Sequence, residues 1–127
     1  MNATIRGTTR ILAIDDEPDN LFTLGTTLAP EFDLQIAIRG EQGLRFAAER
    51  PPDLILLDVM MPKMDGFEVC RRLKADPALR NIPVIFLTAL GEFEAELSGL
   101  ELGAVDYLTK PMNVTLTRQR IRNLMDG

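Results

Sequence analysis

The chain has 127 residues, of which 46% are hydrophobic and 26% charged, and its formal net charge is −5. This length and composition predict one soluble globular domain, because two smaller domains would each bury too little apolar surface. The negative charge disfavours binding to nucleic acid, which depends on Lys and Arg neutralising phosphates. No apolar run is long enough for a bilayer and no signal peptide is recognisable, so we expect a cytoplasmic protein with no membrane partner.

Histidine is absent from the sequence, and Cys70 is its single cysteine. The lack of His excludes Ser-His-Asp and Cys-His catalysis, His-containing zinc sites and a phosphohistidine formed on this chain. Any phosphohistidine donor must therefore be another molecule. A single cysteine cannot form an internal disulfide, and its place in the helical pattern GFEVCRRLK indicates a packing role.

Short apolar runs alternate with segments of helical periodicity, a pattern typical of β-α units around a parallel sheet. The pattern predicts strands at residues 10–15, 34–38, 54–58, 84–88 and 106–108, and helices at residues 18–28, 41–49, 66–75, 91–102 and 113–125. The runs ILAID, LILLD and VIFLT are apolar up to a polar last residue, which favours central strands buried on both faces. We expect residues 1–8 to be frayed or disordered and residues 9–127 to form the domain.

Polar residues occur where the predicted strands end. Asp15 and Asp16 close the first strand, Asp58 the third and Thr88 the fourth, and Lys110 lies just past the fifth. Parallel strands end at one edge of the sheet, where open α/β sheets bind ligands, so these side chains should converge there. Each close pair of carboxylates would repel by about 4 kcal/mol at an effective dielectric of about 20. A divalent cation such as Mg²⁺ would hold them together, and Lys110 would add positive charge.

These residues also have structural interpretations. Asp15 and Asp16 could cap the first helix, Thr88 is an ordinary strand residue, and Lys110 could be a surface lysine. Asp58 is harder to explain in this way, because an unpaired carboxylate at the end of a buried strand is costly to desolvate. Beside a cation, a carboxylate can act as a nucleophile toward phosphorus, and the joint occurrence of acids, hydroxyl and lysine favours phosphoryl transfer.

Over nearly its whole length the sequence resembles the receiver domains of two-component response regulators. The resemblance is carried by ILAIDDEPDN, PDLILLDVMMPKMDGFEVCRRLK, IPVIFLTAL and GAVDYLTKP, which occur in the family's order and spacing. It implies an α/β, flavodoxin-like (βα)5 three-layer sandwich with a five-stranded parallel sheet in the order 2-1-3-4-5. It also implies a phosphoacceptor signalling domain, not an enzyme in the usual sense, that assists its own phosphorylation and dephosphorylation.

The resemblance also implies roles for individual residues. Asp58 would be the phosphoacceptor, assisted by Thr88 and Lys110, while Thr88 and Tyr107 would form the conformational switch. The peptide bond between Lys110 and Pro111 would be cis, aiming the lysine at the site. The ligands of a Mg²⁺ or Mn²⁺ ion would be Asp15, Asp16, Asp58 and the backbone carbonyl of Met60.

The partners that the resemblance implies are a histidine kinase or histidine phosphotransfer protein, and an output domain or downstream protein. The output surface would comprise the fourth helix, fifth strand and fifth helix, and could also form a homodimer. In this chain that surface combines acidic residues with basic ones: Glu92, Glu94, Glu96, Glu101, Arg118, Arg120 and Arg122. These charges form either two solvated helix faces or a docking patch. Whether the chain is a complete regulator or part of a longer protein stays open.

Three rival interpretations were compared with the motifs. A haloacid-dehalogenase-like enzyme needs a second acid two residues after its nucleophile, where this chain has Met60. A flavodoxin-like cofactor binder needs a phosphate-binding loop after the first strand, where Asp15, Asp16 and Glu17 would repel phosphate. A receiver-like interaction module that is never phosphorylated usually lacks an acid, the hydroxyl or the lysine. All are present here, so this module is kept as the alternative.

Overall fold

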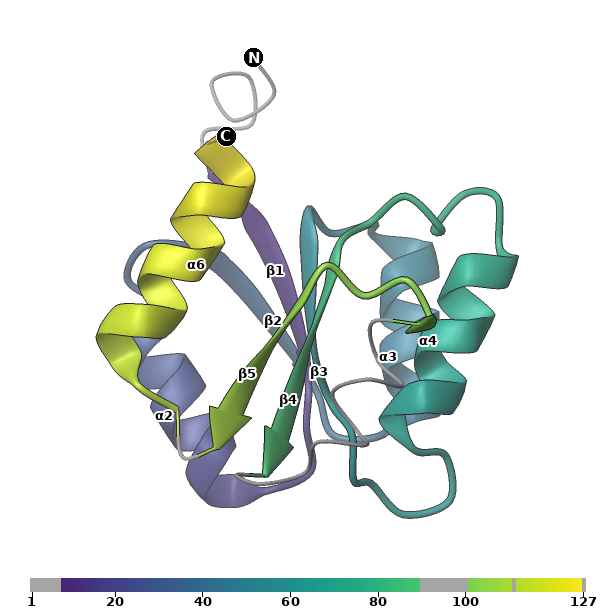
Figure 1. Cartoon of the computed structure of the whole chain (residues 1–127), viewed down its shortest axis with the longest axis horizontal. Helices are drawn as coiled ribbons and strands as arrows, with labels where there is room; N and C mark the ends of the chain where they lie inside the picture. Colours follow the sequence, from purple (N-terminus) through teal and green to yellow (C-terminus); the bar gives the residue numbers. More distant parts are fainter. Residues whose placement is uncertain (1–7, 90–100, 111, 127) are drawn as a thin grey trace.

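The computed structural model describes residues 8–89, 101–110 and 112–126, in which helices cover both faces of one parallel sheet (Figure 1). The elements are β1 (Arg10–Ile14), α2 (Pro18–Leu28), β2 (Asp33–Ala37), α3 (Gly40–Glu49), β3 (Leu54–Asp58), α4 (Gly66–Ala75), β4 (Val84–Ala89), β5 (Asp106–Lys110) and α6 (Val114–Asp126). The strand order is β2-β1-β3-β4-β5, and every neighbouring pair is parallel. The predicted flavodoxin-like α/β fold and its strand order are confirmed.

The central strands are buried because a separate layer of helices packs on each face of the sheet. Figure 1 shows α2 and α6 on one face and α3 and α4 on the other. Alternate residues of β3 supply the two cores: Ile55 and Leu57 pack with the α3 and α4 side, whereas Leu54 and Leu56 pack with the α2 and α6 side. This arrangement explains the continuous apolar run of β3, all five residues of which are buried.

Local sequence signals set where the helices begin. Pro18 occupies the first turn of α2, where its missing N–H is not needed. Asp65 caps α4 by accepting a hydrogen bond from the backbone N–H of Glu68 at 2.9 Å. Both helices therefore start a few residues after a strand ends, which keeps the loops at the carboxyl edge short. Within α4, Cys70 is fully buried and burial raises its pKa, so the predicted packing role is confirmed.

Several predicted boundaries differ from the structure by one or two residues. The clearest error concerns β5, which was predicted to end at residue 108 but extends to Lys110, paired with Ala89 of β4. The polar residues Thr109 and Lys110 concealed this extension, because a backbone ladder does not depend on apolar side chains. Lys110 is thus the last residue of a strand, not a residue beyond it. Most of the predicted segments 1–8 and 91–102 lies outside the described residues.

Candidate functional site

Three carboxylates meet at the carboxyl edge of the sheet. Asp15 and Asp16 follow β1, and Asp58 is the last residue of the neighbouring strand β3. One carboxylate oxygen from each of the three residues lies within 4.8 Å of the other two. The topology alone produces this cluster, because β1 and β3 are adjacent and end at the same level. A set of hard oxygen donors at this separation can hold a divalent cation.

Asp58 is a buried acid with one carboxylate oxygen left without a hydrogen bond among the described residues. Its side chain is only 2% exposed, and its Oδ1 accepts a hydrogen bond from Lys110 Nζ at 2.8 Å. Its Oδ2 is buried and has no hydrogen-bond partner among the described residues. Burial raises the pKa of Asp58 from 3.8 to about 6, and the charge of Asp15 adds to this rise. Lys110 and the backbone N–H of Met60 partly oppose it. The protein therefore holds a carboxylate where water cannot fully solvate it.

Lys110 is the positive charge of the site. Its side chain is 15% exposed, and Nζ lies 2.6 Å from Glu17 Oε1 and 3.6 Å from Asp15 Oδ2, in addition to its bond with Asp58. Burial alone would lower the pKa of Lys110, but the hydrogen bonds to Asp58 and Glu17 outweigh it, so the pKa is raised. Glu17 was not predicted as a site residue. The only sequence signal for it was the unbroken acidic run that follows β1.

Asp15 and Asp16 lie in different surroundings. Asp15 is fully buried: its Oδ1 accepts a hydrogen bond from the backbone N–H of Glu17 at 2.9 Å, and its Oδ2 accepts one from Asn20 Nδ2 at 3.0 Å. Asp16 is partly exposed and makes no hydrogen bond or ion pair with the other described residues. Asp15 thus organises the start of α2 while facing the site. Asn20, which holds it, was also missed by the sequence prediction.

The loop after Asp58 is held close to the acid by Gly66. The backbone N–H of Gly66 donates to the carbonyl of Val59 at 2.9 Å, and a Cβ on Gly66 would lie 2.2 Å from the carbonyl oxygen of Asp58. No larger residue fits there without moving the backbone that carries the acid. Within the loop the Met60 side chain is 67% exposed, so it does not fill the space beside the carboxylates.

The predicted switch residues lie on the neighbouring strands. Thr88 of β4 is 2% exposed and pairs in register with Thr109 of β5, one residue past the level at which Asp58 pairs with Leu87. Tyr107 of β5 is partly buried and packs against the core on the α3 and α4 side. Their switching role stays a prediction. Pro111 lies outside the described residues, as do the predicted acidic residues 92–96.

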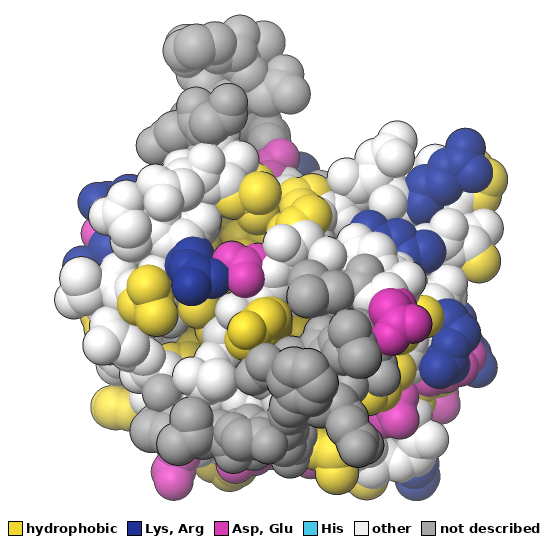
Figure 2. Space-filling model, in the orientation of Figure 1, with side chains coloured by type: hydrophobic (Ala, Val, Ile, Leu, Met, Phe, Trp, Pro, Cys, Tyr) yellow, Lys and Arg dark blue, Asp and Glu magenta, His cyan; other side chains and the backbone are white. Residues whose placement is uncertain are grey.

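The arginines of α6 have partners within the molecule. Arg118 and Arg122 both pair with Glu31, and Arg120 pairs with Asp106. Figure 2 shows dark-blue and magenta side chains next to each other between α6 and β5. These pairs favour the interpretation of this helix face as solvated, with two carboxylates offsetting most of the charge of its three arginines. A homodimer through this surface stays a prediction.

The fold and site together define a flavodoxin-like α/β domain with a cluster of three carboxylates, paired with a lysine, at the carboxyl edge of its sheet. A family model described as the response regulator receiver domain matches residues 11–122, and the chain belongs to this family. Within the described part of the chain, no helix has the length and apolar character required to cross a bilayer.

Curated relatives and solved structures agree with this assignment. The chain is 45% identical over 118 residues to the DNA-binding dual master transcriptional regulator RpaA of Synechocystis, covering 91% of this chain and 48% of the relative. It is 47% identical over 116 residues to response regulator PleD of Caulobacter vibrioides, covering 91% and 26%. It also superimposes on the signal receiver domain of a DNA-binding response regulator from Colwellia psychrerythraea, with a TM-score of 0.86, 32% identity and coverage of 94% and 99%. The chain thus spans less than half of either curated relative.

Proposed function

We propose that this receiver domain accepts a phosphoryl group on Asp58. The donor would be the phosphohistidine of a partner histidine kinase or histidine phosphotransfer protein, or a small phosphodonor. The observation that carries the proposal is the state of Asp58: a buried carboxylate with one oxygen on Lys110 and the other without a partner among the described residues. A purely structural acid would have both oxygens satisfied, because burying an unpaired one is costly.

The donor set fits a Mg²⁺ or Mn²⁺ ion. Asp15, Asp16 and Asp58 offer oxygen ligands, and the backbone carbonyl of Met60 is the proposed fourth protein ligand. Asp16 and Oδ2 of Asp58 have no competing hydrogen bonds among the described residues, which supports a metal-binding role. When bound, the cation would neutralise the carboxylates and the phosphoryl oxygens so that two anions can approach.

In the proposed chemical step, Asp58 is the nucleophile, and Lys110 and Thr88 bind the phosphoryl oxygens. An oxygen of Asp58 forms a bond to phosphorus while the bond from phosphorus to the donor imidazole nitrogen breaks, and that nitrogen keeps the electron pair. Lys110 Nζ lies 2.8 Å from Asp58, so its ammonium can form an ion pair with a phosphoryl oxygen once Asp58 carries the phosphoryl group. The hydroxyl of Thr88 donates to another phosphoryl oxygen. The protein thus contributes mainly position and charge, as phosphoryl transfer requires.

The proposed output is a shift between two conformations. Phosphorylation would favour the state in which Thr88 engages the phosphoryl group and Tyr107 turns inward, by as much as its contacts differ between the states. The affected surface comprises β5, α6 and the predicted helix at 91–102. In a cytoplasmic setting this surface would act on an output domain or a downstream protein. The relatives RpaA and PleD both extend beyond the part that this chain matches.

The direct test is phosphorylation by acetyl phosphate, followed by intact mass. We expect the mass of one phosphoryl group, dependent on Mg²⁺ and absent from Asp58→Asn. Asp19→Asn is the matched control, because Asp19 is an exposed acid in the first turn of α2 and makes no ion pair within the described part of the chain. It should be phosphorylated like the wild type. If the wild type gains no mass and beryllofluoride also fails to bind, the proposal is wrong and the phosphorylation-independent interaction module becomes the better account.

A further inference from the structure

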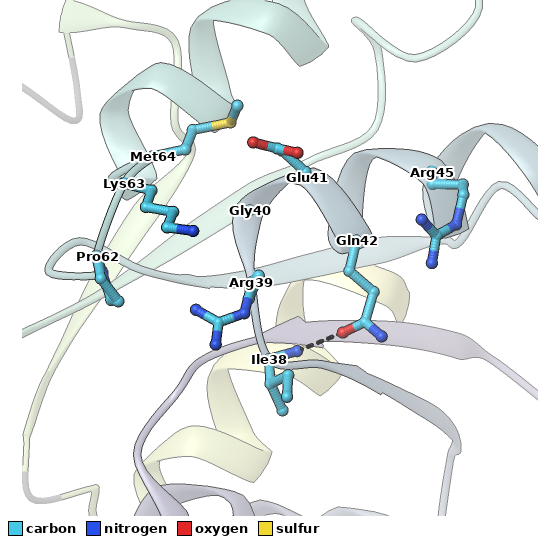
Figure 3. Close-up of a pocket in the computed structure, with 9 residues that line it drawn as sticks. All are labelled: Ile38, Arg39, Gly40, Glu41, Gln42, Arg45, Pro62, Lys63 and Met64. Atoms are coloured by element: carbon cyan, nitrogen blue, oxygen red, sulfur yellow. Dashed lines mark hydrogen bonds between the residues drawn. The ribbon is translucent and has the colours of Figure 1, made fainter.

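A hollow lies on the α3 side of the same sheet edge as the acidic cluster. Its volume is about 270 Å³, and it is formed by the connection from β2 to α3, the first turn of α3 and the loop between β3 and α4 (Figure 3). The polar side chains that line it are Arg39, Glu41, Gln42, Arg45 and Lys63. Three cations and one carboxylate give the lining a net charge of +2, on a chain whose net charge is −5.

Within the described parts of the chain, the three cations of this hollow have no counter-ion. Arg39, Arg45 and Lys63 form no ion pair with any described residue, and Arg45 contacts the Phe46 ring instead. The arginines of α4 and α6, by contrast, are all paired with Glu or Asp. Unpaired like charges gathered around one concavity repel one another, and an anion between them would relieve that repulsion.

Two of the three cations are directed toward a common space. Figure 3 shows the ammonium of Lys63 and the guanidinium of Arg39 extending between Pro62 and the start of α3, whereas the Glu41 carboxylate points toward Met64. Gln42 is oriented by its Oε1, which accepts the backbone N–H of Ile38 at 2.8 Å, and its amide and the guanidinium of Arg45 lie away from these two cations in Figure 3.

Lys63 is also the only non-glycine residue with positive φ in the part of the chain that is described, at 69°. This conformation belongs to a three-residue turn in which the backbone N–H of Met64 donates to the carbonyl of Pro62 at 2.8 Å.

From this convergence we propose that the hollow binds the phosphate group of a small ligand. Two unpaired cations that share one space, in a lining with a net charge of +2, suit a compact dianion that can accept several hydrogen bonds at once. The volume is below that of a drug-sized ligand site but sufficient for a phosphate group with a short substituent. The first turn of α3 has no side-chain cap, and the positive end of the helix dipole there would further favour a bound anion.

The position of the hollow would allow a bound ligand to affect the acceptor site through the loop between β3 and α4. Lys63 belongs to the loop that begins directly after Asp58 and is tied back to it at Gly66, whereas Arg39 belongs to the connection before α3. A phosphate held by both cations would link these two segments and restrain the loop that follows the acceptor. The site is therefore distinct from the phosphorylation site but mechanically connected to it.

The test is a titration with inorganic phosphate, followed by backbone amide NMR shifts in metal-free buffer at constant ionic strength. Without a divalent cation or phosphodonor, Asp58 chemistry cannot contribute. We expect saturable shifts clustered at residues 38–42 and 60–64. Lys63→Gln and Arg39→Gln should each weaken the apparent affinity at least about tenfold, as the loss of a charged hydrogen bond implies. Arg80→Gln is the matched control, since Arg80 is exposed, unpaired within the described residues and precedes β4 at the opposite sheet edge.

The outcomes separate clearly. Local, saturable shifts that are lost in either variant and kept in Arg80→Gln support the site. A second titration with glycerol phosphate then identifies the source, because tighter binding than inorganic phosphate indicates a phosphate ester and weaker binding indicates the free ion. Shifts that stay linear with concentration, or that are equal in all variants, mean that phosphate only screens surface charge, and they overturn the proposal. Both variants alter exposed side chains, so an unchanged spectrum elsewhere verifies folding.

Discussion

Replacing Asp58 by Asn should stabilise the fold at neutral pH when no divalent cation is present. Burial holds the pKa of Asp58 near 6 instead of 3.8, so the ionised carboxylate is less favourable in the folded chain than in the unfolded one. A shift of this size corresponds to about 3 kcal/mol at most. Part of that gain will be lost, because Lys110 gives up its bond to a charged partner, although Glu17 and Asp15 remain beside it. A gain of about 1–2 kcal/mol is therefore expected.

The raised pKa of Asp58 also determines how its contribution to the free energy of unfolding changes with pH. Between about pH 4 and pH 6 the folded state binds more protons at Asp58 than the unfolded state does, because its pKa is raised when folded. The contribution of Asp58 to the free energy of unfolding therefore falls as the pH rises through this window and stays low above it. In Asp58→Asn this contribution disappears, so the difference in stability between variant and wild type should grow from pH 4 to pH 7.

Urea unfolding of the wild type and Asp58→Asn at pH 4.5 and pH 7.5, in metal-free buffer, measures both effects. Asp19→Asn is again the control for loss of one negative charge, because it is exposed and should change stability by only a few tenths of a kcal/mol. Saturating Mg²⁺ should reduce the advantage of the variant, since the ion binds the folded wild type. A variant that is less stable than the wild type at pH 7.5, or a difference that shrinks with pH, would refute the assignment of Asp58 as a strained buried acid.

Two further substitutions test how the site is built. Glu17→Gln should lower the pKa of Lys110, which can be measured from its side-chain NMR signals. Because Glu17 is exposed, the free energy of unfolding should change by less than about 1 kcal/mol. An unchanged pKa would mean that the contact between Glu17 and Lys110 is not maintained in solution. Gly66→Ala should cost about 3 kcal/mol in urea unfolding, since the new Cβ would meet the Asp58 carbonyl, whereas Gly25→Ala has open space and should gain about 0.5–1 kcal/mol. Equal effects of the two alanines would contradict this explanation of Gly66.

The sequence predicted the fold well because its strongest signals are the ones that determine it. The apolar run of β3 has no polar residue before Asp58, and only a strand covered on both faces has such a pattern. The strand order, in contrast, came from the family resemblance, since periodicity contains no information about which strands are neighbours. Boundaries were least accurate where polar residues continue a strand, as Thr109 and Lys110 do at the end of β5.

The candidate site was predictable to the extent that strand ends define it. The acids could be placed at one edge because they follow apolar runs that had to be buried, and Lys110 could be placed there because it follows the short predicted strand 106–108. Glu17, Asn20 and Gly66 could not be found in this way. Their importance depends on distances across the fold, such as the 2.6 Å between Glu17 and a lysine 93 residues away, and on backbone proximity at Gly66. Local sequence patterns do not report such contacts.

The charges of the site explain why a cation and a phosphoryl group should depend on each other. Asp15, Asp16, Glu17 and Asp58 contribute four negative charges, and Lys110 offsets only one of them. A phosphoryl dianion entering this field would be repelled by several kcal/mol at an effective dielectric of about 20. A divalent cation removes most of that repulsion, and the phosphoryl group in turn would offer the cation another oxygen ligand. Lys110 alone does not offset that repulsion, so we expect phosphorylation without Mg²⁺ or Mn²⁺ to be negligible.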